Sequence, residues 1–184
     1  VGVAPTRVEF SGETMGTTYS VVVYAETAAQ RTATDGLQQS VDSLLADINS
    51  KMSTWDPESE LSRFNTYGGT DPFPVSQETA GVFALAAEVS AATDGAFDIT
   101  VGPLVNAWGF GPEEEDKAPS EEELAALGEQ VGYEKVRVSL DPPALTKARP
   151  DVYCDLSAIA KGYAVDRVAA LLAAKGFPRH LVEI

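Results

Sequence analysis

An apolar run followed by a long helical pattern constrains the fold of this chain most. Residues 152 to 154, Val-Tyr-Cys, are typical of a short β-strand, and Asp155 to Asp166 then opens a helix. The helix is predicted because its apolar residues recur at helical spacing, at Ala160, Tyr163, Ala164, Val168, Leu171 and Leu172, before Gly176 ends it. A strand that feeds a helix places free backbone N–H groups and the positive end of the helix dipole at one spot, which suits phosphate.

Two residues at this helix start have side chains that could bind a ligand. Lys161 adds a mobile cation in the first turns, and Asp155 can cap free amides, hydrogen-bond a ribose or base, or lie near a metal. The plainer interpretation is favoured for each residue alone, because an Asp before a helix is usually a cap and a first-turn Lys is usually solvated. These two residues do not establish a phosphate site by themselves.

Length and composition indicate a globular protein with one substantial core. The chain has 184 residues, of which 44% are hydrophobic and 22% are charged, so it can fold without disulfides. Its single cysteine, Cys154, lies in an apolar run, which favours a buried thiol over a reactive one. The formal net charge of -15 repels nucleic acid and anionic lipid, so an anionic ligand needs a local cation or a metal.

Strand and helix patterns together predict an α+β fold, a mixed sheet with flanking helices. Thr17 to Tyr24 is rich in β-branched and aromatic residues and predicts a strand, whereas Thr34 to Met52 has one apolar face and predicts a helix. Further helices are expected around Leu61 to Phe64, from Ser76 to about Asp94, and from Ser120 to about Gln130; further strands are expected at Tyr133 to Leu140, Ala144 to Lys147 and His180 to Ile184. The first half is thus expected to hold one strand.

Two segments in the first 110 residues have both a functional and a structural interpretation. Trp55 follows the long helix and is either a stacking surface or, with Phe64, part of the core. Residues 96 to 110 are rich in glycine, which fits either a backbone that approaches a ligand closely or a buried connection with Pro103 in the first turn of a short helix. After them, Pro112 to Pro119 predicts an acidic surface loop.

Four segments, taken together and in order, resemble the ApbE family of flavin transferases, enzymes that move FMN from FAD onto a protein. They are Met15-Gly-Thr-Thr-Tyr19, Met52-Ser-Thr-Trp-Asp-Pro-Glu-Ser-Glu-Leu-Ser-Arg-Phe-Asn65, Gly95-Ala-Phe-Asp-Ile-Thr-Val-Gly-Pro-Leu-Val-Asn106 with Trp108-Gly-Phe110, and Asp155 to Asp166. The resemblance spans the chain from about Glu9 to Ile184.

Carried over by position, the resemblance implies a set of FAD contacts: Met15, Trp55, Ala96, Phe97, Asp98, Asp155 and Lys161. It also implies that the carbonyl of Ala158 is a ligand of Mg²⁺, a hard cation that accepts oxygen donors. Family members often have Tyr at the position of Trp55, so a hydroxyl contact is expected to be lost while stacking remains.

The family pattern continues past Ile184, so the resemblance implies one flavin transferase domain over residues 1–184 that is truncated at its C-terminal side. The catalytic residues and the other metal ligands are expected beyond Ile184. The implied reaction is Mg²⁺-dependent transfer of FMN from FAD to a Thr or Ser hydroxyl of a target flavoprotein, with release of AMP. Two alternatives stay open: a pyrophosphatase that hydrolyses FAD to FMN and AMP, and a non-catalytic FAD-binding or carrier module.

Partners and location are also implied by the resemblance. The acceptor is expected to be a flavoprotein subunit of a redox complex. The family is usually exported and lipid-anchored, so the protein is expected in the periplasm or on the outer face of the bacterial cytoplasmic membrane, touching the membrane only through an N-terminal anchor. The acidic composition gives no reason to expect nucleic acid as a partner.

Overall fold

A computed structural model describes residues 4–112 and 118–184 of the chain, in two compact units. The first unit contains Val1–Asn49 and Lys161–Ile184, and the second contains Ser50–Ala160. The predicted α+β class is confirmed, with one three-stranded sheet, β1-β2-β6, in the first unit and another, β3-β5-β4, in the second. All strand pairs among the described residues are antiparallel. The interpretation of residues 1–184 as one domain stays a prediction.

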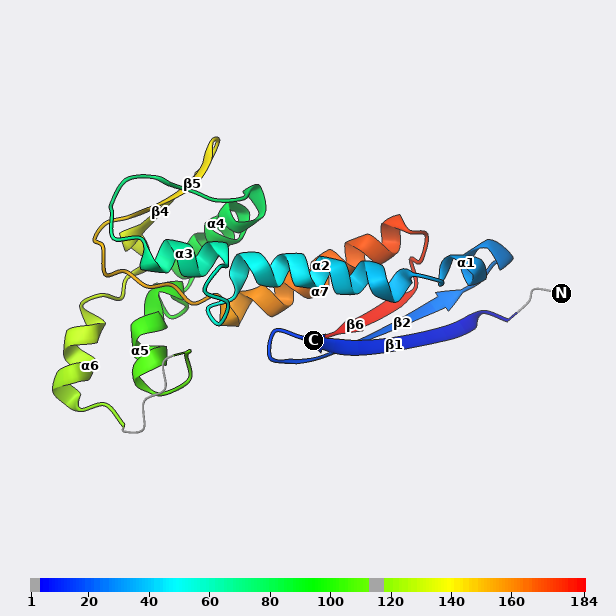
Figure 1. Cartoon of the computed structure of the whole chain (residues 1–184), viewed down its shortest axis with the longest axis horizontal. Helices are drawn as coiled ribbons and strands as arrows, with labels where there is room; N and C mark the ends of the chain where they lie inside the picture. The colour runs from blue at the N-terminus through cyan, green and yellow to red at the C-terminus, as the bar shows by residue number, and fades with distance from the viewer. Residues whose placement is uncertain (1–3, 113–117) are drawn as a thin grey trace. The chain divides into compact units, whose positions relative to one another are not determined.

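The sheet of the first unit is built on a long hairpin (Figure 1). Strands β1 (Thr6–Thr14) and β2 (Thr17–Ala25) pair along their whole length, and β6 (His180–Glu183) pairs with the other edge of β2. β1 was not predicted, and the expectation of one strand in the first half is wrong. Its residues alternate between exposed and half-buried positions, so it lacks the apolar run by which β2 was recognised.

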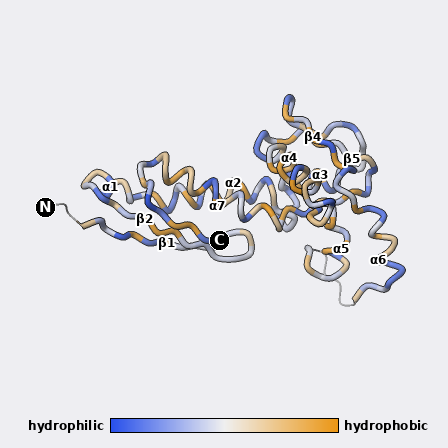
Figure 2. Tube along the Cα trace, turned by 180° about the vertical axis from the view of Figure 1, so that it is seen from behind, coloured by the Kyte–Doolittle hydropathy of each residue, from blue (hydrophilic) through white to orange (hydrophobic). Residues whose placement is uncertain are grey.

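Helices cover the hairpin of the first unit. They are α1 (Ala28–Ala33), most of α2 (Leu37–Met52) and most of α7 (Ser157–Ala174). The predicted apolar face of α2 is buried, and Figure 2 shows hydrophobic positions that recur along the helix. Gly176 follows α7 with φ +89°, which confirms the predicted stop. The predicted strand at the C-terminal end is β6.

The second unit contains the remaining elements in chain order: α3 (Glu60–Thr66), β3 (Phe73–Pro74), α4 (Gln77–Ala92), a 3₁₀ turn η1 (Ile99–Val101), α5 (Gly102–Ala107), α6 (Glu121–Gly128), a 3₁₀ turn η2 (Tyr133–Lys135), β4 (Val136–Leu140) and β5 (Pro143–Lys147). The predicted N-caps of α4 and α6 are confirmed, since Ser76 and Ser120 each accept a hydrogen bond from the backbone N–H three residues on. The predicted acidic loop from Pro112 to Pro119 lies mostly outside the described residues.

Aromatic rings form the core of the second unit. The ring of Phe64 is fully buried, and its centroid lies 5.9 Å from those of Phe73 and Phe83. Edge-on and tilted ring pairs of this kind add to the hydrophobic stabilisation from burial. Phe64 is therefore core, as one of the two interpretations held, whereas Trp55 is not part of it, with 67% of its surface exposed.

One predicted strand is absent. Val152 to Cys154 has neither strand nor helix geometry and no strand partner. The run is apolar because Val152 and Cys154 are fully buried, so the sequence pattern indicated burial correctly but not pairing. The side chain of Asn65 makes the hydrogen bonds that a neighbouring strand would make to Cys154.

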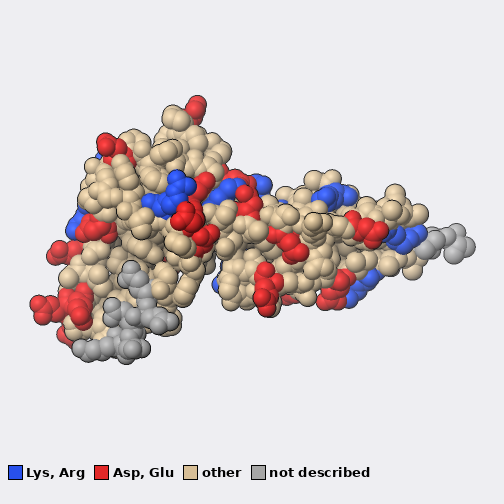
Figure 3. All heavy atoms as spheres, viewed as in Figure 1, with Lys and Arg blue, Asp and Glu red and all other residues tan. Residues whose placement is uncertain are grey.

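Acidic side chains are spread over the face that Figure 3 shows, among fewer Lys and Arg residues. Within the described residues, no helix is long and apolar enough to cross a membrane.

Candidate functional site

Two of the predicted FAD contacts, Asp98 and Asp155, each cap the start of a helix with one carboxylate oxygen. Asp98 caps η1, because its Oδ1 accepts hydrogen bonds from the backbone N–H of Thr100 at 2.8 Å and from its hydroxyl at 2.7 Å. Asp155 precedes α7, and its Oδ1 accepts from the N–H of Ser157 at 2.6 Å. Over residues 4–112 and 118–184, the second carboxylate oxygen of each aspartate has no hydrogen bond. Each side chain thus caps a helix start with one oxygen, and its other oxygen is available as a hydrogen-bond acceptor.

The backbone brings these two aspartates together within the second unit. The N–H of Asp155 donates to the carbonyl of Ile99, the residue after Asp98, at 2.7 Å. Asp98 and Asp155 both act electrostatically on the thiol of Cys154. Burial, chiefly, raises the pKa of that thiol to about 12, and the two carboxylates add to the rise while Lys147 opposes it. The predicted buried, unreactive thiol is confirmed.

Ala96 and Phe97 lead into Asp98 from a tight turn at the end of α4. Asp94 and Gly95 both have positive φ, 50° and 78°, a conformation that glycine tolerates at helix ends. The Phe97 N–H then donates to the hydroxyl of Thr93 at 3.1 Å. Ala96 is exposed and Phe97 half-buried, so both can face a ligand.

The loop that carries Trp55 is held firmly although the indole is exposed. The hydroxyl of Ser53 accepts from the N–H groups of Trp55 at 3.1 Å and Asp56 at 3.2 Å. The carbonyl of Ser53 accepts from the hydroxyls of Ser59 at 2.5 Å and Ser62 at 3.1 Å. An exposed ring on an ordered loop fits the interpretation of Trp55 as a stacking surface.

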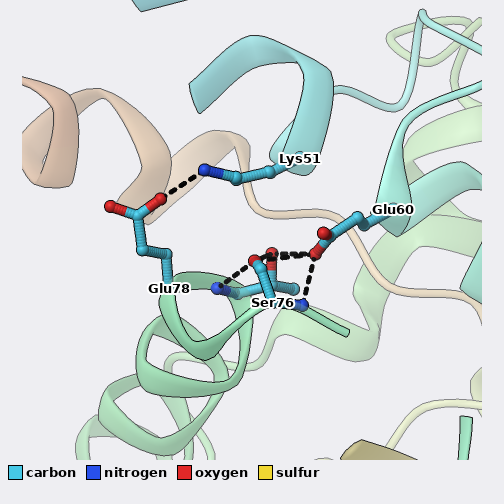
Figure 4. A network of polar contacts seen from close by, with 5 residues as sticks. Lys51, Glu60, Ser76 and Glu78 are labelled. Atoms are coloured by element: carbon cyan, nitrogen blue, oxygen red, sulfur yellow. Dashed lines mark hydrogen bonds and ion pairs between the residues drawn. The ribbon is translucent and has the colours of Figure 1, made fainter. Parts of the chain in front are cut away.

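A second polar network anchors the helix that follows this loop (Figure 4). Glu60, the first residue of α3, accepts from the N–H of Ser76 at 3.0 Å and from its hydroxyl at 2.9 Å. Lys51 pairs with Glu78 in the first turn of α4 at 2.5 Å. These groups join the ends of α2, α3 and α4, and their mutual contacts account for their positions without a ligand.

The start of α7 offers less to a phosphate than its sequence indicates. The N–H of Ser157 donates to Asp155, and those of Ile159 and Ala160 donate to the carbonyl of Leu156. Among the first four amides of α7, the one of Ala158 alone has no acceptor in the described part of the chain.

The predicted magnesium ligand of this chain is a main-chain carbonyl. The described residues contain no group of three or more His, Cys, Asp or Glu side chains that could hold a metal. Ala158, the predicted ligand, lies in the first turn of α7, where helix carbonyls already accept backbone hydrogen bonds. The assignment of the Ala158 carbonyl as a ligand of Mg²⁺ stays a prediction.

Met15 and Lys161 belong to the first unit. Met15 forms the turn of the hairpin with Gly16, and both have positive φ, 49° and 71°, as a two-residue type I′ turn requires. A hollow of about 550 Å³ lies at this turn, lined by residues 13–18. A methionine held in the left-handed region is uncommon, which fits a side chain placed for contact. Lys161, in the second turn of α7, is exposed.

Two residues that shape the site were not predicted. Thr100 orients Asp98, and its hydroxyl also accepts from the N–H of Gly132 at 2.7 Å. Asn65 holds the segment before Asp155. Both lie inside the segments that carry the family resemblance, so their presence there was the available signal.

Small antiparallel sheets with flanking helices define an α+β protein, and two aspartates of its second unit each have one carboxylate oxygen without a hydrogen bond among the described residues. The sequence assigns it more closely: residues 15–184 match the model of the ApbE family, and the chain belongs to that family.

Relatives and solved structures agree with this assignment. The chain is 44% identical over 179 residues to the FAD:protein FMN transferase of Vibrio cholerae, covering 97% of this chain and 52% of the relative. It is 38% identical over 176 residues to that of Escherichia coli K12, covering 94% and 49%. The solved flavin transferase ApbE from Vibrio cholerae superposes with a TM-score of 0.89 at 42% identity, over 98% of this chain and 57% of that one. The chain therefore spans about half the length of these curated relatives.

Proposed function

We propose that the protein containing this chain is an FAD:protein FMN transferase. The observation that carries the proposal is the similarity to enzymes of that name over nearly the whole chain. In the reaction, the hydroxyl oxygen of an acceptor Thr or Ser bonds to the FMN phosphorus of FAD, the pyrophosphate bond breaks, and AMP leaves. The hydroxyl proton passes to a base, which we expect in residues outside this chain.

The residues of this chain are proposed to bind and orient FAD. The free oxygens of Asp98 and Asp155 are acceptors suited to the hydroxyl and N–H groups of adenosine or flavin. The exposed indole of Trp55 is suited to stack on a ring. We also propose Met15, Ala96, Phe97 and Lys161 as contacts of FAD, as the family resemblance implies. The reaction is proposed to need Mg²⁺, with the carbonyl of Ala158 as one ligand and the other donors beyond this chain.

The test uses the full-length protein with FAD, Mg²⁺ and a flavoprotein acceptor, and measures covalent flavin on the acceptor by in-gel fluorescence and mass spectrometry. We expect FMN on a Thr or Ser and one AMP for each FMN attached. Free FMN without acceptor labelling would instead favour the pyrophosphatase, and FAD binding with neither product would favour a carrier. EDTA is expected to stop the transfer.

Two variants test the placement of FAD. Asp155→Asn is expected to weaken FAD binding, because it exchanges the free acceptor oxygen for an amide. Asp166→Asn changes an exposed residue on α7, the helix that follows Asp155; it is the matched control and is expected to bind FAD as the parent does. Equal binding by both variants would argue against this site.

We further propose that the protein is exported, acts on a flavoprotein subunit of a redox complex, and reaches the membrane through a lipid anchor. The family resemblance supports this. Fractionation of cells that express the tagged full-length protein would test it, with recovery in the cytoplasm as the contrary result.

A further inference from the structure

The peptide bond between Cys154 and Asp155 is held at both of its polar atoms. Its carbonyl accepts a hydrogen bond from Asn65 Nδ2 at 2.8 Å, and its N–H donates to the carbonyl of Ile99 at 2.7 Å. Asn65 Oδ1 also accepts from the N–H of Cys154 at 2.8 Å. One amide side chain therefore makes both of the bonds to Cys154 that a neighbouring strand would make.

These groups are shielded from water. Asn65 and Asp155 are each 8% exposed, Ile99 is 4% and Cys154 is 0% exposed. A buried N–H or carbonyl that loses its partner costs about 1–3 kcal/mol. No strand lies beside this segment in the described residues, so loss of Asn65 leaves the carbonyl of the 154–155 peptide without a substitute partner, and the peptide is then held only through its N–H bond to Ile99.

Asn65 is itself fixed from the other side. It lies near the end of α3, and its own carbonyl accepts from Lys147 Nζ at 2.8 Å. Lys147, on β5, is 1% exposed and donates further to the carbonyls of Tyr67 and Pro150. The amide that holds the 154–155 peptide is thus attached to the sheet of the second unit.

The plane of this peptide sets the direction in which the Asp155 side chain leaves the backbone. With Oδ1 bound to the N–H of Ser157, the remaining freedom of the carboxylate is small, and the free Oδ2 is held in one place. We propose that Asn65 is a positioning residue that sets FAD affinity by orienting Asp155. The proposal rests on the proposed function, in which Asp155 contacts FAD.

The test compares the full-length wild type with Asn65→Ala, Asp155→Asn and the double variant, by calorimetric titration with FAD. Each single variant is expected to weaken FAD binding roughly tenfold, the scale of one hydrogen bond to a charged group. The double variant is expected to be no weaker than the worse single variant, because the two residues act through one contact. Asn65→Asp is nearly isosteric but loses the donor to the Cys154 carbonyl, so it replaces Asn65→Ala in this test if that variant does not fold. It is expected to weaken FAD binding to the same extent.

Two readouts separate positioning from a loss of stability. Phe83→Leu, a core change whose ring packs edge-on against Phe64, is the control: it lowers the melting temperature and is expected to change FAD affinity less than twofold. Hydrogen exchange of the Asp155 amide is expected to quicken in Asn65→Ala but not in Phe83→Leu.

Three outcomes would overturn the inference. In the first, folded Asn65 variants bind FAD as tightly as the wild type. In the second, the loss of FAD affinity in the double variant equals the product of the fold-losses of the two single variants, so that Asn65 acts independently of Asp155. Both leave the proposed function standing. If the wild type binds no FAD at all, the proposed function fails and the role of Asn65 fails with it.

Discussion

The hydroxyl of Tyr19 allows a prediction with a worked magnitude. Tyr19, on β2, is 2% exposed and donates a hydrogen bond to the carboxylate of Asp42 on α2. Burial first, and then Asp42, raise the pKa of Tyr19 from 10.0 to about 12. We predict that Tyr19→Phe destabilises the protein by about 1.5–3 kcal/mol at pH 7, the value of a hydrogen bond to a charged group.

The pH dependence gives a second test of this environment. A pKa raised in the folded state contributes stability that is complete below pH 10 and is lost as the pH rises through about 12. The advantage of the wild type over Tyr19→Phe is therefore expected to be constant up to about pH 9.5 and to shrink between pH 10 and 12.

The assay is urea unfolding of both proteins at steps from pH 7 to 11.5, with the tyrosine absorbance at 295 nm followed in parallel. Tyr133→Phe, in the second unit, is the control; its hydroxyl makes no hydrogen bond within residues 4–112 and 118–184, so a small effect on stability at pH 7 is expected. A difference between wild type and Tyr19→Phe that stays unchanged up to pH 11.5 would refute the reasoning.

Four further predictions concern the second unit. Lys147→Met is expected to destabilise the protein by about 2–4 kcal/mol, since buried carbonyls lose their donor. Burial lowers the pKa of Lys147 below 10.5, so the wild type should gain stability relative to the variant as the pH rises toward 10.5. Urea unfolding at several pH values measures both effects. Gly102→Ala should destabilise the protein by about 1–3 kcal/mol, because its Cβ would lie 2.3 Å from the ring of Tyr153. An unchanged melting temperature in thermal unfolding would contradict this. Ser120→Ala should cost about 1 kcal/mol through the lost cap of α6, seen as a lower melting temperature. Cys154, buried and with its pKa at about 12, should react with a thiol reagent only after denaturant is added; a fast native reaction would contradict this.

The sequence predicted elements well where local chemistry decides them. The apolar face of α2, the caps Ser76 and Ser120 and the stop at Gly176 all depend on residues within a few positions of one another. The strand β1 was not predicted, because its residues alternate between exposed and half-buried positions rather than between exposed and buried ones. Val152 to Cys154 was misread because burial and strand pairing produce the same apolar run.

In the candidate site, too, local sequence patterns predicted some features and missed others. Asp98 and Asp155 could each be predicted as a cap and possible ligand from its own neighbours. Their meeting through the carbonyl of Ile99 depends on residues more than fifty positions apart, which no local pattern encodes. Lys147 was missed for the same reason, since its buried ammonium binds carbonyls of a helix end distant in sequence.

Asn65 binds only main-chain atoms of residue 154, so these two hydrogen bonds do not depend on which side chain residue 154 has. A small apolar replacement such as Cys154→Ala should therefore keep the geometry of the neighbouring aspartate while removing the single thiol of these 184 residues. A thiol-free chain of this kind would accept a new cysteine at any chosen surface position, and a fluorophore attached there could report FAD binding without a competing label in the interior.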